Sequence, residues 1–95
     1  MKYIRVKWNH ANPDEPIWLF SEVDTDGAEV RKLECFRNGF CDFATANINS
    51  GTTKLSTQPL PELDKIARDP EFQPTEITKQ EFEDVWQKRR FFKST

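Results

Sequence analysis

The chain has 95 residues, 36% of them hydrophobic and 13% aromatic, which suits one small domain with a modest core. The chain has fourteen basic and sixteen acidic residues, a net charge of −2. Without the four cations of residues 88–95, ten basic and sixteen acidic residues remain, and the net charge is −6. Such an acidic body disfavours a general nucleic-acid role, which requires concentrated Lys and Arg, and is compatible with a basic protein partner.

Alternation of apolar and charged residues predicts a first strand at residues 2–8. Its face toward the core holds Ile4, Val6 and Trp8. Turn-forming residues follow at 9–16, and Pro cannot donate to a strand ladder. The apolar run 17–20 then predicts a second strand.

A turn around Gly27, which allows a positive φ, leads to a predicted third strand from Glu29 to Phe36. The alternation in this strand is imperfect. Either a bulge or an exposed Val30 would explain the slip.

Asn38-Gly39 between two extended runs predicts a hairpin with a two-residue type I′ turn, followed by a fourth strand from Phe40 to about Ala44. In that register Cys35 lies opposite Asp42, so Cys35 and Cys41 point to opposite faces of the sheet. A disulfide or a shared metal between the two cysteines is therefore disfavoured.

Residues 45–59 are rich in Ser, Thr and Asn and predict a long loop, with a short edge strand near Thr52 to Leu55 as an option. Pro61 suits the first position of a short helix that stops at Asp69-Pro70. Residues 71–77 are expected to cross over to the last helix.

Thr78 and Glu81 fit a capping box that starts this last helix, and Ile77 and Phe82 fit a hydrophobic staple. Phe82 also begins an apolar stripe that continues through Val85 and Trp86. The cations of the last turns favour the helix dipole.

Strands followed by helices predict a single α+β domain over residues 1–95, with the basic tail 88–95 partly flexible. Its expected architecture is an antiparallel β-meander of about four strands, then a short helix, then a C-terminal helix packed on one sheet face.

The start Met1–Arg5 leads into alternation, so no signal peptide is expected, and no run approaches the length of a membrane span. The expected compartment is the cytoplasm, where two cysteines are expected to be reduced.

The only histidine, His10, lies within six residues of Asp14 and Glu15. Such groups can form an acid–base pair or part of a metal site. The favoured interpretation is a structural turn, because two prolines flank the acids and a structural metal needs about four ligands. In this turn Asp14 is expected to bond its own backbone.

Other catalytic or metal sites find little support in the residues. Asp24-Thr25-Asp26-Gly27 resembles the start of a calcium loop, but the twelfth position is Cys35 instead of Glu. No glycine-rich phosphate loop and no nucleophile beside a base is visible. We therefore expect no enzyme, no catalytic residue, no cofactor and no metal.

Four stretches together carry a resemblance: KYIRVKWNHANPDEPIWLFSEVD, EVRKLECFRNG, PLPELDKIARDPEF and EITKQEFEDVW. From roughly Lys2 to Trp86 the chain resembles a family of short bacterial proteins known only as a domain of unknown function. It departs from the family in the Ser/Thr-rich middle and in the KRRFFK tail. The resemblance implies a bacterial, soluble, stand-alone domain and supplies no reaction, ligand or catalytic residue.

The leading functional hypothesis is a non-enzymatic protein-binding domain with a basic partner. An immunity-type or accessory protein of a toxin system is its sharpest form, by analogy with other small bacterial domains. The candidate contact residues are aromatic or acidic. They are Trp18, Phe20, Asp14, Glu15, Glu22, Asp24 and Asp26.

The alternative hypothesis is a single-stranded nucleic-acid-binding module in which bases stack on Trp18 and Phe20. A more ordinary reading is that these aromatics pack under a helix or the long loop. The cations for this alternative are Arg31, Lys88, Arg89, Arg90 and Lys93.

Overall fold

The computed structural model describes the backbone of residues 1–94 and the side chains of residues 1–88. Its described part forms one antiparallel sheet of five strands, in the order β4-β3-β2-β1-β5, with two helices. The elements are β1 (Lys2–Trp8), β2 (Trp18–Val23), β3 (Glu29–Cys35), β4 (Cys41–Ala44), α1 (Leu63–Ile66), β5 (Phe72–Ile77) and α2 (Lys79–Ser94). The predicted α+β class is confirmed, with five strands where about four were expected.

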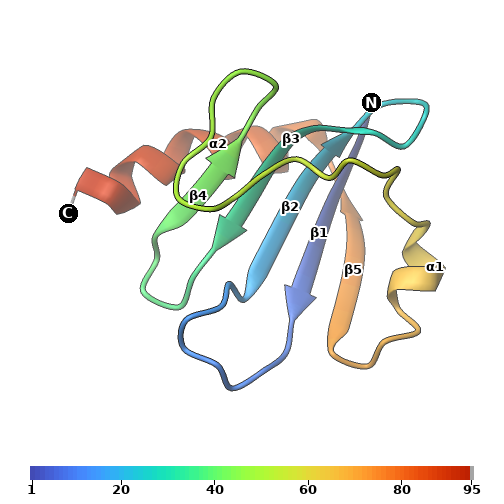
Figure 1. Ribbon diagram of the computed structural model, residues 1–95, viewed down its shortest axis with the longest axis horizontal. Helices are drawn as coiled ribbons and strands as arrows, with labels where there is room; N and C mark the ends of the chain where they lie inside the picture. The colour runs from blue at the N-terminus through green and yellow to red at the C-terminus, as the bar shows by residue number, and fades with distance from the viewer. Residues whose placement is uncertain (95) are drawn as a thin grey trace.

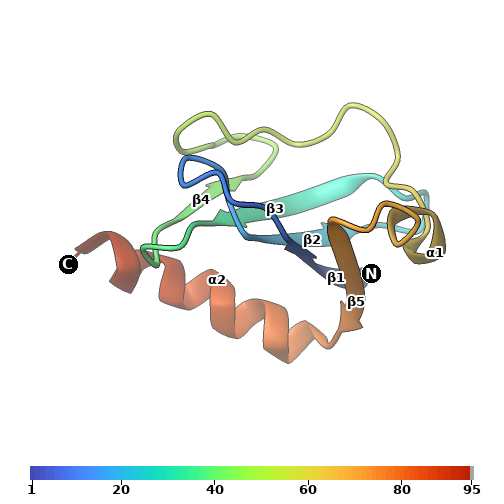
Figure 2. The ribbon, with the colours of Figure 1, turned by 90° about the horizontal axis from the view of Figure 1, so that it is seen from below.

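The sheet lies between two different covers (Figures 1 and 2). Helix α2 runs across one side, which we call the helix face. The long segment 45–62 and α1 lie on the other side, which we call the loop face. The core is therefore split into two layers, one on each face of the sheet.

On the helix face, apolar side chains from every strand meet Phe82 of α2, which is completely buried. Trp86 stacks on Phe82, with ring centroids 6.0 Å apart, and meets Phe43 of β4 edge-on at 5.7 Å. The buried residues of this layer are Tyr3, Phe20, Leu33, Cys35, Cys41, Ile77 and Phe82.

The loop-face layer is smaller and centres on Ile4, Val6 and Val23. The alternation of β1 places Ile4 and Val6 here, as the sequence predicts. The partly buried residues that pack on them come from the sheet, the long segment, α1 and β5. They are Leu19, Leu60, Leu63, Ile66 and Phe72.

The capping box at the start of α2 is confirmed. Thr78 Oγ1 accepts from the Glu81 amide at 3.1 Å, and Glu81 accepts from the Thr78 amide at 3.0 Å. Ile77 and Phe82 are buried in the same cluster, as a staple requires. The bond from the Thr78 amide also lowers the pKa of the Glu81 carboxyl, because it favours the charged form.

The prediction for the cysteines is wrong. Cys35 lies directly opposite Cys41 in the β3–β4 ladder, and the two form a disulfide on the helix face. The hairpin loop has three residues, 37–39, because the Phe36 amide bonds the Phe40 carbonyl at 2.8 Å. Among the described residues only glycines have positive φ, so Asn38 cannot form a type I′ turn and Gly39 alone turns the chain, at φ 90°.

The segment 71–77 is not a simple crossover, because it forms β5 and pairs with β1. Pro74 lies within β5, and a proline is tolerated in an edge strand, where no ladder bond requires its missing N–H. The proline explains why the sequence did not indicate this strand.

Three local predictions are refined. The irregularity in the third strand is a bulge, since Glu22 pairs with Arg31 while Val23 pairs with Glu29. The segment 52–55 is not a strand, and the long segment contributes only an isolated bridge between Ala44 and Asn49. Helix α1 begins at Leu63, two residues after Pro61.

Candidate binding groove

A pocket of about 760 Å³ opens beside the turn between β2 and β3. That turn, residues 24–27, forms one wall, and residues 59–64 form the other. The two walls are joined directly, because the Leu60 amide donates to the Gly27 carbonyl at 2.8 Å. Ile4 and Val23 of the sheet complete the lining.

Gly27 makes this junction possible. Its φ is +85°, and a Cβ built on it would lie 3.3 Å from the Pro59 Cβ. We expect Gly27→Ala to lower the free energy of unfolding by about 1 kcal/mol, because an L side chain is strained at positive φ. Urea denaturation measures this loss. The matched variant Ala28→Ser, at the next exposed position of the same turn, should unfold like the wild type, and equal losses in the two variants would contradict the role of Gly27.

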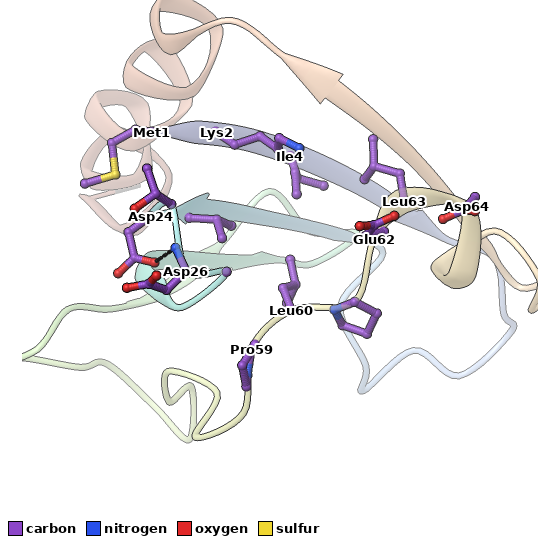
Figure 3. Close-up of a pocket in the computed structure, with 14 residues that line it drawn as sticks. Met1, Lys2, Ile4, Asp24, Asp26, Pro59, Leu60, Glu62, Leu63 and Asp64 are labelled. Atoms are coloured by element: carbon purple, nitrogen blue, oxygen red, sulfur yellow. Dashed lines mark hydrogen bonds between the residues drawn. The ribbon is translucent and has the colours of Figure 1, made fainter.

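Acidic side chains lie on both sides of the pocket: Asp24 and Asp26 on one side, Glu62 and Asp64 on the other (Figure 3). Lys2 is the one basic side chain among its lining residues. The pocket is thus an apolar hollow with a negatively charged rim.

The turn itself fixes the carboxylate of Asp24. Its Oδ1 accepts from the amides of Asp26 at 2.9 Å and Ala28 at 3.0 Å. Within the described residues, no hydrogen bond or ion pair engages the carboxylates of Asp26, Glu62 and Asp64. These three charges are available to a ligand, and a cation would relieve their mutual repulsion.

A second pocket, of about 350 Å³, adjoins the first. Leu60 and Pro61 line both pockets, so the two hollows are parts of one groove between the sheet and the 59–66 segment. Its lining combines the apolar residues Val6, Leu19, Ile66 and Phe72 with five polar or charged ones: Ser21, Glu29, Lys32, Lys65 and Asp69.

Buried polar contacts fix the segment that bounds the groove. The Glu29 side chain is 1% exposed, and it accepts from the Ser56 amide at 2.7 Å and the Ser21 hydroxyl at 2.8 Å. Thr53 donates to Glu34, and the Lys32 ammonium bonds the Lys54 carbonyl at 3.2 Å. The polar side chains on the loop face of β3 thus anchor the long segment to the sheet.

Arg31 forms a different cluster, on the helix face. Its guanidinium bonds Glu22 at 2.6 and 3.1 Å and Glu83 of α2 at 2.9 and 2.8 Å. It also lies 4.8 Å from the ring centroids of both Phe82 and Trp86. These bonds hold the pKa values of the Glu22 and Glu83 carboxyls below their usual range and raise that of Arg31.

Tyr3 completes this cluster by donating to Glu22 at 2.8 Å. Burial, and then the bond to the Glu22 carboxylate, raises the pKa of the Tyr3 hydroxyl. The groups satisfy one another, so the cluster clamps α2 to the sheet.

His10 shapes the turn between β1 and β2. Its Nδ1 accepts from the Asn12 amide at 3.1 Å, so Nε2 carries the proton and donates to the Pro16 carbonyl at 2.8 Å. The ring also packs on Trp8, with centroids 4.4 Å apart. The side chain of Asn12 takes the role expected of Asp14, because Asn12 Oδ1 accepts from the Asp14 amide at 2.9 Å.

The structure brings together only some of the predicted contact residues. Asp24 and Asp26 line the groove, whereas Asp14 and Glu15 lie in the turn at the opposite end of the strands. Phe20 and Glu22 are buried on the helix face, so neither can form part of an exposed contact surface in this structure.

A family model described as "Domain of unknown function (DUF6881)" matches residues 2–91. The chain belongs to the DUF6881 family. No curated protein and no solved structure matches it. The resemblance seen in the sequence is therefore confirmed, and the family supplies no reaction or ligand for this fold.

The remaining candidates of the DUF6881 domain concern cations and metals. Lys88 is exposed, while the side chains of Arg89, Arg90 and Lys93 lie outside those that the structure describes. No three His, Cys, Asp or Glu side chains of the described residues are grouped so that they could hold a metal. In that same part of the chain, no helix is long and apolar enough to cross a membrane.

Sequence reasoning missed half of the acidic rim. The sequence pattern indicates Glu62 and Asp64 only as part of a short helix. They reach Asp24 and Asp26 through the Gly27–Leu60 hydrogen bond, which joins segments 33 residues apart. The one available signal was the acidic pair itself beside two prolines and two leucines in PLPELD.

Proposed function

We propose that this domain binds a basic partner protein without catalysing a reaction, and that the groove is the binding site. The carboxylates on both sides of the apolar pocket of about 760 Å³ carry this proposal. A Lys or Arg side chain can bury its aliphatic stem between such walls while its charge meets the rim. An immunity-type or accessory protein of a toxin system is the sharpest form of the proposal.

Charge supports a protein partner of this kind. The rim has four carboxylates, and Lys2 is the one basic side chain among the lining residues. The body of the chain outside residues 88–95 is itself negative. Complementary charge speeds association and excludes acidic proteins, while apolar contact supplies the affinity.

We expect the triple variant Asp26→Asn/Glu62→Gln/Asp64→Asn to bind the partner about tenfold more weakly, because three partly exposed ion pairs are lost. The wild type and the variant are used to capture proteins from the native host, and captured proteins are quantified. Basic proteins enriched by the wild type are then purified and titrated by calorimetry.

The matched control is Asp14→Asn/Glu15→Gln/Glu71→Gln, which removes the same charge at exposed positions outside the groove lining. It should bind like the wild type, and binding should weaken with salt. Equal binding by the two triple variants, or no basic protein preferred by the wild type, would overturn the proposal.

The nucleic-acid alternative has one supporting observation. Trp18 lies on the helix face with Arg5 at 5.4 Å and Lys7 at 5.8 Å from its ring centroid. Two other residues that the sequence suggests for this alternative are not available to a nucleic acid in this structure. Phe20 is buried, and Arg31 is paired with the carboxylates of Glu22 and Glu83.

Trp18→Ala tests the alternative directly. If bases stack on this ring, the variant should bind a fluorescent single-stranded oligonucleotide at least about tenfold more weakly than the wild type. Fluorescence anisotropy at low salt measures both affinities, with Phe40→Ala, an exposed aromatic of the β3–β4 hairpin, as control. Absence of binding by the wild type at low salt removes the alternative.

A further inference from the structure

The two parts of the groove demand a particular ligand composition. The first part is rimmed by carboxylates and suits cations. In the second part Ser21 bonds Glu29, Lys32 bonds the Lys54 carbonyl and Asp69 accepts from the Glu71 amide, while the lining also includes Lys65. The rest of the lining is apolar, in a volume of about 350 Å³, near the lower end of the range of roughly 300–1,000 Å³ typical of ligand pockets. A ligand that fills both parts must carry basic and bulky apolar groups side by side.

The chain contains such a segment at its own C-terminal end. Residues 88–93 read KRRFFK, with four cations, two phenylalanines and no acid. Its charge is opposite to that of the groove rim. The rest of the chain, with a net charge of −6, would also attract this segment from a second copy.

The groove and the segment of one copy are placed too far apart to meet. Helix α2 lies on the helix face and the groove on the loop face. Trp86 contacts Phe43 of the edge strand β4, and α2 continues to Ser94, so its last turns extend about 10 Å beyond that edge. In Figure 1 the C-terminal end and α1 are at opposite sides of the sheet.

We propose that the KRRFFK segment of one copy docks in the groove of a second copy. The cations of the segment meet Asp26, Glu62 and Asp64, and a phenylalanine enters the apolar part between Leu19 and Phe72. A symmetric pair satisfies both grooves at once, because each copy offers one segment and one groove. In this state the segment occupies the proposed partner site, so a basic partner protein competes with self-association.

A charge swap tests this contact in the full chain. The groove variant Asp26→Lys/Glu62→Lys/Asp64→Lys and the tail variant Arg89→Glu/Arg90→Glu/Lys93→Glu each place like charges at the contact. Each alone should remain monomeric by sedimentation velocity over about a hundredfold range of concentration, whereas the wild type should associate. Mixing the two variants restores opposite charges at both contacts and should restore the dimer.

Two further variants separate the apolar part of the contact from the charges. Phe91→Ser/Phe92→Ser should weaken self-association about tenfold or more, as should Leu19→Trp, which fills the second pocket. Leu19→Met, with nearly the same volume, should associate like the wild type. The charge control Asp14→Lys/Glu15→Lys/Glu71→Lys should also leave association unchanged, and circular dichroism shows whether each variant is folded.

A wild type that stays monomeric at the highest concentration, or a mixture of the swapped variants that stays monomeric, would overturn the contact. So would a groove or tail variant that dimerises alone. These outcomes leave the proposed function standing, because capture of a basic protein by the groove is measured separately. Conversely, a dimer restored by the swap without any basic partner would support self-association alone.

Discussion

Replacing Arg31 by methionine is expected to lower the free energy of unfolding by about 3 kcal/mol, because the variant leaves a buried carboxylate without its cation. Glu22 has a side chain that is 9% exposed, and Arg31 supplies two of its hydrogen bonds. Methionine keeps apolar contact with Phe82 and Trp86. The decrease in the free energy of unfolding therefore results mainly from removal of the Arg31 charge and its hydrogen bonds. Urea denaturation at neutral pH measures it.

The pH dependence of this loss identifies its cause. In the wild type the pKa of Glu22 is held below its ordinary value of 4.5, mainly by the hydrogen bonds from Arg31. A depressed pKa in the folded state means that the stabilisation is present above about 4.5 and is lost as the pH falls through the folded pKa. Without Arg31, burial raises this pKa, so the variant gains stability on acidification relative to the wild type.

The difference between wild type and Arg31→Met should therefore shrink as the pH is lowered toward 4. Glu83→Gln is the matched control, because its side chain is 27% exposed and its loss should cost only about 1 kcal/mol. Equal losses for the two variants, or a loss for Arg31→Met that does not change with pH, would contradict a clamp centred on Glu22.

Local signals predicted the parts of the fold that depend on neighbours in the chain. The alternation of β1 and the capping box at Thr78 each follow from a few adjacent residues, and the sequence also indicated an irregularity near Val30 without deciding that it is a bulge. The hairpin at Asn38-Gly39 was also found, but its loop length was not. The same residues are compatible with a hairpin loop of two or of three residues. The loop length sets the register and so decides which residue lies opposite Cys35.

Features that depend on distant residues were not predictable in this way. β5 was hidden by Pro74, and only its pairing with β1 stabilises that segment as a strand. The groove likewise exists because Leu60 bonds Gly27 and Glu29 holds Ser56. The acidic residues of the β2–β3 turn, Asp24 and Asp26, could be found from the sequence. The other two acids of the rim, Glu62 and Asp64, could be placed beside them only once the path of the long segment was known.

The β3–β4 hairpin gives the second large effect. Breaking the Cys35–Cys41 disulfide is expected to lower the free energy of unfolding by about 2 kcal/mol, because it removes a constraint on a loop with a sequence separation of 6 in the unfolded chain. Loop entropy rises only slowly with length, so even this short loop retains most of the effect. Urea denaturation with and without a thiol reductant measures the difference.

The double variant Cys35→Ala/Cys41→Ala serves as the control, because reductant should not change its unfolding curve. It should also be less stable than the reduced wild type, since both sulfurs are buried in the helix-face core, at 7% and 1% residue exposure. Titration of free thiols in the unreduced, denatured wild type should find none. Two free thiols there, or identical curves for the wild type with and without reductant, would show that the two cysteines face each other without a bond that stabilises the hairpin.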